Sequence, residues 1–344
     1  MSTCVFRDAT EIGDFGEPYV VAEVNTSHNG SMDRARAMID QAQAAGCRCV
    51  KFQSWSDVSL YSKTYYDGNP IARKIVRKFS LNETQIVELA RYCRGRGIAF
   101  ASTPYSRREV DLLVDACAVP YVKVASMDLN NLPFLEYIAR TGVPIVLSTG
   151  MGELDEIRRA VAAIQAAGNR QLCLLHCISI YPPKIPDIQL LNIAGLRQEF
   201  PECPVGFSDH SLGIEMAAAA TALGAAMIEK HLTLDRSIIG MDNQMALEPS
   251  EMAQLVRDCR NVHAAMGGRE RVVSPAELEQ RQKMRRSVVA ARDLPVGTVL
   301  GIDDLDAKRP GSGIPPDRIG TLVGRTLGRA VEKDAVIALA DLID

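Results

Sequence analysis

One strand–helix–strand unit stands out in PVGFSDHSLGIEMAAAATALGAAMIEKH (204–231). A short apolar run begins at Pro204, an alanine-rich stretch follows at 214–223, and a second apolar run begins at Ala226. Short continuous apolar runs are typical of strands buried on both faces, and the alanine-rich stretch between them suits a helix. The two runs lead into His210 and His231, so each predicted strand ends on an imidazole.

The same alternation of short apolar runs and helical patterns extends back toward the N-terminus. Six further runs are YVVAEV from Tyr19, RCVKF from Arg48, IAFAST from Ile98, YVKVAS from Tyr121, PIVLST from Pro144 and LCLLHC from Leu172. Helical patterns separate them at 32–45, 153–167 and 188–199; another at 249–266 follows the eighth run. Residues Ser80–Glu83 match a capping box, which predicts a helix that begins there and runs to about Arg96. Eight such units predict a (β/α)8 TIM barrel, with an open doubly wound sheet as the alternative.

Near Gly267 the strand–helix pattern ends and the sequence becomes rich in charged residues. We predict a catalytic barrel over residues 1–268, a charged linker over 269–286 and a small β-rich domain over 287–344. Residues 54–80 form a long polar connection within the barrel, of the kind that serves as a lid or binding loop.

Composition narrows the classes of function. The net charge of −3 offers no basic face for nucleic acid. Nine cysteines without a CxxC pair are interpreted as buried free thiols rather than a disulfide framework. The N-terminal segment lacks the apolar core of a signal peptide, and no apolar run reaches membrane-spanning length, so we expect a cytoplasmic protein without membrane contact.

Polar side chains gather where the predicted strands end. They are Glu23, Lys51, Gln53, Thr103, Lys123, Ser126, Ser148, Ser179, Tyr181, Ser208, His210 and His231. A barrel builds its active site at this rim, so we expect these residues to face one pocket.

Each group leaves alternatives open. His210 and His231 could share a divalent metal or only orient their neighbours. Lys51 and Lys123 could hold a ligand with two anionic ends, form a Schiff base as in a pyruvate aldolase, or reach to the surface. Glu23 could be a general base, a metal-shell residue or part of a structural ion pair.

With these residues in place, the chain resembles the sialic acid synthase family over nearly its whole length. The motifs are AEVNTSHNG (22–30), VKFQ (50–53), STPYS (102–106), VKVAS (122–126), LSTGM (147–151), HCISIYPP (176–183), GFSDHSLG (206–213), IEKHLTLD (228–235) and GMDNQMALEP (240–249). The tail, with AARDLPVGTVL and KRPGSGI, is similar to the family's antifreeze-like (SAF) domain.

The resemblance implies condensation of phosphoenolpyruvate with an N-acylamino-hexose such as N-acetylmannosamine, using water and releasing phosphate. It implies a divalent metal, Mn²⁺ or else Mg²⁺ or Co²⁺, bound by His210 and His231. Phosphoenolpyruvate would lie among Lys51, Thr103, Lys123, Ser126, Ser148, Ser179 and Ser208, and the sugar would contact Gln53, Tyr181 and Asp242. It further implies a homodimer in which the antifreeze-like domain covers the partner's barrel, so that Arg309 holds the N-acyl group across the interface.

Some positions depart from the family's pattern. Ser27 stands where an asparagine is usual, Asp128 where many members have glutamate, and GMDN (240–243) where GPDH is frequent. These departures concern the sugar: the alternative substrate is a 2,4-diacetamido-trideoxy-hexose leading to legionaminic or pseudaminic acid. ALEP (246–249) favours the sialic or legionaminic side. A non-catalytic sugar- or ice-binding protein is a further alternative, suggested by the tail domain alone.

Overall fold

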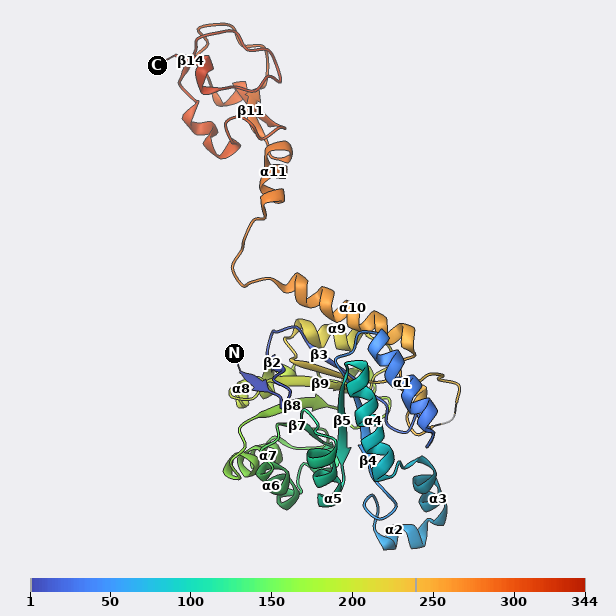
Figure 1. Ribbon diagram of the computed structural model, residues 1–344. Helices are drawn as coiled ribbons and strands as arrows, with labels where there is room; N and C mark the ends of the chain where they lie inside the picture. Colours follow the sequence, from blue (N-terminus) through green and yellow to red (C-terminus); the bar gives the residue numbers. More distant parts are fainter. Residues whose placement is uncertain (1, 239, 344) are drawn as a thin grey trace. The chain divides into compact units, whose positions relative to one another are not determined.

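The computed structural model describes residues 2–238 and 240–343. The chain divides into two compact units, Met1–Gly267 and Gly268–Asp344, and each is described by itself. Figure 1 shows the first unit as strands surrounded by helices and the second as a small β-rich body.

Eight parallel strands form the centre of the first unit. They are β3 (Tyr19–Glu23), β4 (Cys49–Ser54), β5 (Ala99–Pro104), β6 (Val122–Val124), β7 (Ile145–Ser148), β8 (Leu172–Cys177), β9 (Val205–Asp209) and β10 (Met227–His231). Their hydrogen-bonded order is β5-β4-β3-β10-β9-β8-β7-β6, so the last strand pairs with the first. A doubly wound sheet would not join these two strands. The predicted barrel is therefore confirmed, nearly closed, with β5 and β6 at the ends of the order.

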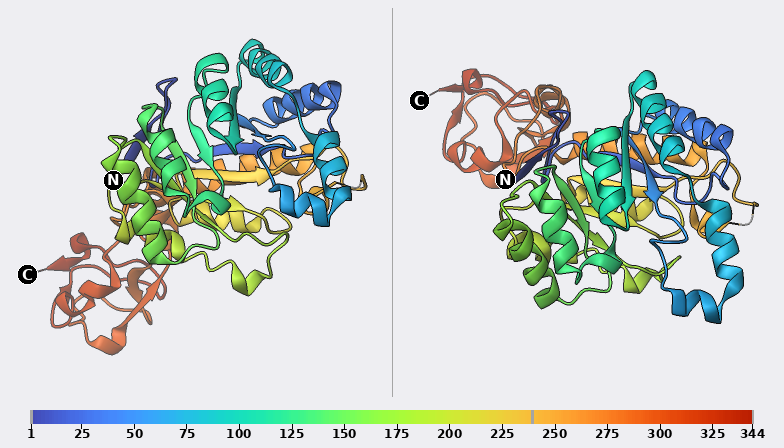
Figure 2. Two further views of the ribbon diagram at one scale, coloured as in Figure 1. Left: turned by 90° about the horizontal axis from the view of Figure 1, so that it is seen from below. Right: turned by 60° about the horizontal axis from the view of Figure 1, so that its bottom comes forward.

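The helices lie around the strands, as the two views of Figure 2 show. They are α1 (Met32–Ala44), α4 (Glu83–Arg96), α5 (Arg107–Asp111), α6 (Leu132–Arg140), α7 (Leu154–Ala166), α8 (Asn192–Glu199), α9 (Glu215–Ala222) and α10 (Pro249–Met266). None of the helices in the described part of the chain is long and apolar enough to cross a membrane.

Two details of the prediction were wrong. The connection at 54–80 is largely helical, with α2 (Lys63–Gly68) and α3 (Pro70–Phe79) inside it. The capping box of α4 is formed by Asn82 and Gln85 rather than by Ser80 and Glu83. The Ser80 hydroxyl instead donates back to the Arg77 carbonyl oxygen at 3.3 Å, so Ser80 ends α3 and does not begin α4.

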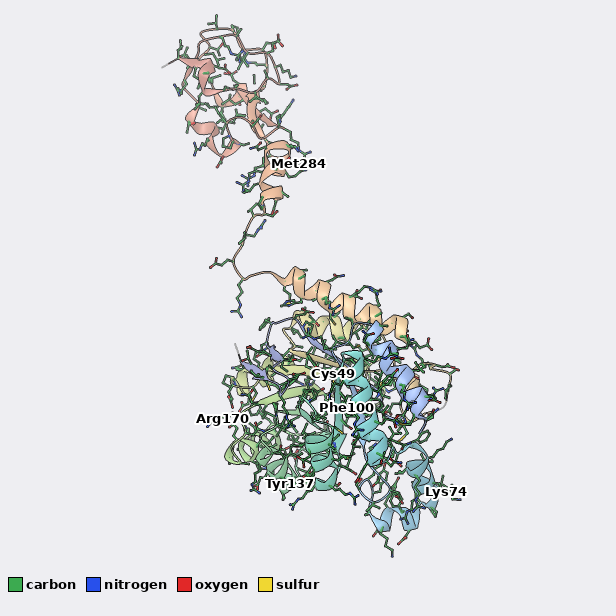
Figure 3. The ribbon with its side chains drawn as sticks, in the orientation of Figure 1. Cys49, Lys74, Phe100, Tyr137, Arg170 and Met284 are labelled. Atoms are coloured by element: carbon green, nitrogen blue, oxygen red, sulfur yellow. The ribbon has the colours of Figure 1, made fainter. Side chains whose placement is uncertain are left out.

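Each barrel strand contributes to two apolar cores. Alternate side chains of β3, such as Val20 and Ala22, pack outward against the helices, whereas Tyr19 and Val21 pack inside the barrel. The hairpin of β1 (Thr3–Val5) and β2 (Glu11–Gly13) adds to this inner core, and the ring centroids of Phe6 and Tyr121 lie 4.7 Å apart. Figure 3 places Cys49 and Phe100 among the strands and Tyr137 on an outer helix. All nine cysteines are buried with free thiols.

The second unit begins with α11 (Pro275–Met284), which lies within the predicted linker. Strand β11 (Ser287–Ala290) pairs with β12 (Leu305–Lys308), and β13 (Thr326–Leu327) pairs with β14 (Leu342–Ile343), both antiparallel. Val288, Leu294, Leu300, Leu322 and Ile337 are buried in its small core.

A fully buried ion pair joins β9 to β10 on the helix side of the barrel. Lys230 Nζ lies 2.8 Å from Asp209 Oδ2, and both side chains are 0% exposed. Lys230 also donates to the Ser211 carbonyl oxygen at 2.6 Å, and Asp209 accepts the Ser211 hydroxyl at 2.6 Å. These bonds fix the backbone at His210 and His231, which follow the two charged residues.

We expect Lys230→Met to destabilise the barrel by about 3 kcal/mol or more, because it leaves the Asp209 carboxylate buried without its cation. Denaturant unfolding followed by the fluorescence of Trp55, the single tryptophan, measures this for the first unit. Arg140→Met, which removes an exposed ion pair with Glu136 on α6, is the matched control. Equal midpoints for the two variants would contradict the prediction.

Candidate active site

One pocket opens at the carboxyl ends of the barrel strands, with a cavity volume of about 350 Å³. Its lining brings together the predicted Glu23, Lys51, Gln53, Thr103, Lys123, Ser126, Ser148, Ser179, Tyr181, Ser208, His210, His231 and Asp242. Arg309 lies in the second unit, exposed, directly after β12, so its position relative to this pocket stays a prediction.

Four charged side chains lie buried at the base of the pocket. Lys51 Nζ is 2.5 Å from Glu23 Oε2 and 3.7 Å from Glu229 Oε1. Strand register explains the cluster, because Glu23 is paired with both Lys51 and His231 on neighbouring strands. Lys123 completes the set, so two ammonium groups and two carboxylates balance one another in a region shielded from water.

Burial and mutual interaction separate the pKa values of the two carboxyls. Burial raises the pKa of Glu23, and Glu229 adds to this effect. Burial also opposes ionisation of Glu229, but Lys51 and Lys123 outweigh it and lower the pKa of that carboxyl. Of the two carboxyls, Glu23 is therefore the one that takes up a proton more readily.

Glu229 was missed by the sequence analysis. It accepts a hydrogen bond from Ser208 at 3.0 Å, and its Oε2 has no hydrogen-bond partner in the described part of the chain. The sequence does indicate this position: Glu229 precedes His231 by two residues, so strand alternation places both side chains on the same face.

The hydrogen-bond partners of Lys123 are uncharged. Its Nζ donates to the Ser148 hydroxyl at 2.7 Å and to the Val124 carbonyl oxygen at 3.0 Å. Burial lowers the pKa of this ammonium group. Lys51, in contrast, keeps a raised pKa, because Glu229 and Glu23 outweigh the effect of burial. An incoming anion would therefore gain most from Lys123.

A cradle for such an anion lies beside Lys123. The Gly150 N–H donates to Ser126 Oγ at 3.1 Å. A methyl group at Gly150 would come within 2.4 Å of Ser179 Oγ and 2.8 Å of Ser126 Oγ. The two hydroxyls thus occupy the space that a side chain would fill, as is usual where a backbone must approach an oxyanion.

The two histidines suit a shared divalent metal. Their ring centroids are 5.4 Å apart. His210 Nδ1 lies 2.8 Å from the Ile178 carbonyl oxygen, which assigns the ring proton to Nδ1 and leaves Nε2 free as a ligand. Burial lowers the pKa of His231 well below its usual value, so its ring is neutral. The described residues contain no group of three His, Cys, Asp or Glu side chains that could hold a metal, so a metal at this place would have the two imidazoles as its protein ligands.

Gln53 is held by an aromatic pair. Its Oε1 accepts hydrogen bonds from Trp55 Nε1 at 3.0 Å and from the Tyr105 hydroxyl at 3.1 Å. This arrangement turns Nε2 toward Glu23 Oε1, which it meets at 2.9 Å. The Gln53 side-chain amide therefore links the Trp55 ring to the buried Glu23 by hydrogen bonds.

Two of the departures from the family pattern touch each other. The Ser27 hydroxyl lies 2.5 Å from Asn243 Oδ1, and Asn243 Nδ2 donates to the Ile238 carbonyl oxygen at 2.8 Å. Asp242, between this anchor and the pocket, is hydrogen-bonded to Asn25. The third departure, Asp128, accepts from Asn131 at 3.0 Å and is not among the lining residues.

Comparison with known proteins agrees with this geometry. The NeuB family model matches residues 38–271, and the SAF domain model matches 285–343. The chain belongs to the NeuB family. It is 34% identical to human N-acetylneuraminate-9-phosphate synthase over 95% of this chain and 92% of that protein. It is also 34% identical to N,N'-diacetyllegionaminic acid synthase of Legionella pneumophila, over 90% of each.

A solved structure supports the same relation. The N-acetylneuraminic acid synthetase of Leptospira borgpetersenii superimposes with a TM-score of 0.74 at 30% identity. The match covers 81% of this chain and 96% of that one. The curated relatives include sialic, legionaminic and pseudaminic acid synthases, so the predicted family is confirmed.

We expect binding of inorganic phosphate in the pocket to change the fluorescence of Trp55, because the anion alters the field around Glu23 and Gln53. A titration monitored by tryptophan emission measures the effect. Gln53→Leu, which cuts the link between Trp55 and Glu23, should reduce the change at saturation. An undiminished signal in that variant would show that the amide does not transmit it.

Proposed function

We propose that this protein condenses phosphoenolpyruvate with an N-acylamino-hexose to form a nonulosonic acid, with release of phosphate. The single observation that carries the proposal is the buried set of two lysines and two carboxylates beside two histidines in one pocket. A double anion can be held at its base while a carbonyl reacts above it. The family of synthases to which the chain belongs supports the same reaction.

Phosphoenolpyruvate would place its phosphate on Lys123 and on the hydroxyls of Ser126, Ser148 and Ser179. Its carboxylate would lie near Lys51, Thr103 and Ser208. Lys51 Nζ donates a hydrogen bond to the Thr103 hydroxyl at 3.2 Å, and the Ser208 hydroxyl donates one to Glu229. Holding both ends fixes C3 against the sugar, and such positioning can supply about 7 kcal/mol or more of the barrier reduction.

A divalent metal, Mn²⁺ or else Mg²⁺ or Co²⁺, would be held by His210 and His231 and, when bound, would polarise the sugar aldehyde as a Lewis acid. The protein's own groups then handle protons. C3 of phosphoenolpyruvate bonds to the aldehyde carbon, and Glu23, with its raised pKa, can donate a proton to the resulting alkoxide. Water adds at C2 as Glu229 takes its proton. The C2–O bond to phosphate then breaks, and loss of the hydroxyl proton leaves the keto group.

From the sequence, Glu23 could be a general base, a metal-shell residue or part of a structural ion pair. The carboxyl arrangement supports a division of work in which Glu229 is the base and Glu23 the acid, because their pKa values are pushed in opposite directions. Tyr181, whose ring centroid lies 4.1 Å from that of His210, would flank the sugar together with Gln53 and Asp242. A homodimer that brings the partner's antifreeze-like domain over the barrel remains part of the proposal, with Arg309 contacting the N-acyl group.

One observation favours a second candidate. Burial lowers the pKa of Lys123, as is typical of an amine that forms a Schiff base with a carbonyl substrate. A pyruvate aldolase of that type would be trapped by borohydride with pyruvate and would not depend on a metal.

We expect phosphate release only when phosphoenolpyruvate, an N-acylamino-hexose and a divalent metal are all present. The assay is phosphate release across a panel of such sugars, with EDTA-treated protein and added Mn²⁺. Stable borohydride adducts with pyruvate, together with activity unaffected by EDTA, would favour the aldolase and contradict the proposal.

Gly150→Ala should raise the KM for phosphoenolpyruvate about tenfold or more, since the added methyl displaces two serine hydroxyls from the phosphate. The fold should persist, because the two hydroxyls can rotate away and the third neighbour, the Cys177 carbonyl oxygen at 3.1 Å, has to shift by only a few tenths of an ångström. The KM for the sugar should change far less. Gly95→Ala on α4, where an added methyl meets no atom within 4 Å, is the matched control. An unchanged KM for phosphoenolpyruvate would remove Gly150 from the phosphate site.

A further inference from the structure

The mouth of the pocket differs in chemistry from its base. Met127, Met151 and Met241 line it and are 55%, 71% and 51% exposed, respectively. They come from three separate segments, after β6, β7 and β10. Methionine side chains are apolar and adaptable, so their convergence on one opening favours an apolar ligand group there.

Cations are confined to the base. Among the described residues of the first unit that line the pocket, Lys51 and Lys123 are the only lysines or arginines. Both are buried, at 3% exposure. Lys51 is already paired with two carboxylates, and Lys123 faces the serine hydroxyls of the anion cradle.

The carboxyl next to Met241 belongs to Asp242, whose Oδ2 lies 4.0 Å from His231 Nδ1, so the described part of the segment that carries Met241 brings no cation to the mouth. Among the described lining residues, Asp242 joins Glu23 and Glu229 as a third carboxylate and lies next to Met241. A phosphate group at the mouth would therefore lose part of its hydration without meeting a lysine or arginine among the described residues of the first unit.

The orientation of the sugar follows from the proposed function, on which this inference rests. Its aldehyde must reach the histidines and C3 of phosphoenolpyruvate at the base. The opposite end of the open chain, with C6, therefore points out between the methionines.

We propose that the pocket selects an N-acylamino-hexose with an uncharged C6 end, with a 6-deoxy methyl group preferred, and that it rejects a 6-phosphate. The relatives include synthases named for a 9-phosphate product and for diacetyllegionaminic acid, so family membership alone leaves this choice open. The three exposed methionines, and the confinement of the lining lysines to the base, favour the uncharged, less polar sugar.

The test compares kcat/KM for three sugars with the full-length protein, phosphoenolpyruvate and Mn²⁺. We expect 2,4-diacetamido-2,4,6-trideoxymannose to be used best, N-acetylmannosamine less well, and N-acetylmannosamine 6-phosphate at least about 100-fold less well than the best sugar. Equal or better use of the phosphorylated sugar would overturn the inference while leaving the proposed function intact. Phosphate release with none of the three would instead reject the proposed function and this inference with it.

A charge placed at the mouth provides the second arm. Met151→Arg should raise the kcat/KM ratio of the 6-phosphate sugar to N-acetylmannosamine about tenfold, whereas the neutral Met151→Gln should not. Leu191→Arg adds the same charge outside the pocket at a residue that is 75% exposed, and should leave the ratio unchanged. An unchanged ratio in Met151→Arg, or an equal rise in Leu191→Arg, would show that the charge at the mouth does not set the preference.

Discussion

Two ammonium groups and two carboxylates buried together at the base of one pocket set the conditions for everything around them. Removing any one of these charges would leave another uncompensated in a region shielded from water, at a cost of several kcal/mol. The strands that carry them must therefore keep their register, and the backbone beneath must stay rigid. The ion pair of Lys230 with Asp209 meets this need on the opposite face of β9 and β10, one residue before each histidine.

Strand alternation links these two ion-pair systems. On β10, Glu229 and His231 face the pocket, and Lys230 between them faces the helices. A shift of one residue would exchange the two sets and bury charges against apolar helices, so the charged pattern itself specifies the register. The same alternation gives β3 an inner face that runs from Tyr19 in the apolar core to Glu23 in the pocket.

Much of this arrangement could be predicted from the sequence, because buried parallel strands produce continuous apolar runs and their polar ends converge. The eight strands and the pocket-facing side chains of the barrel follow from that rule. Glu229 escaped because it lies inside an apolar run rather than at its end, where polar residues were sought. The helices α2 and α3 escaped because their polar residues resemble those of a loop. The capping box was misplaced by two residues, since Ser80 and Asn82 are both good N-caps and only the end of α3 decides between them.

The pocket thus divides into a base fixed by charge and a mouth fixed by local packing. At the base, a substitution of any charged residue would disturb several ionised groups, so the position of a bound double anion is restricted. At the mouth, side chains such as Met151 are exposed and bear little on stability. Ser27 and Asn243 illustrate the difference: two positions that depart from the family pattern contact each other and still hold the segment that carries Asp242. A fold built this way can vary the mouth of its pocket while keeping the chemistry proposed for the base, because Met127, Met151 and Met241 are exposed whereas the charged groups at the base are buried.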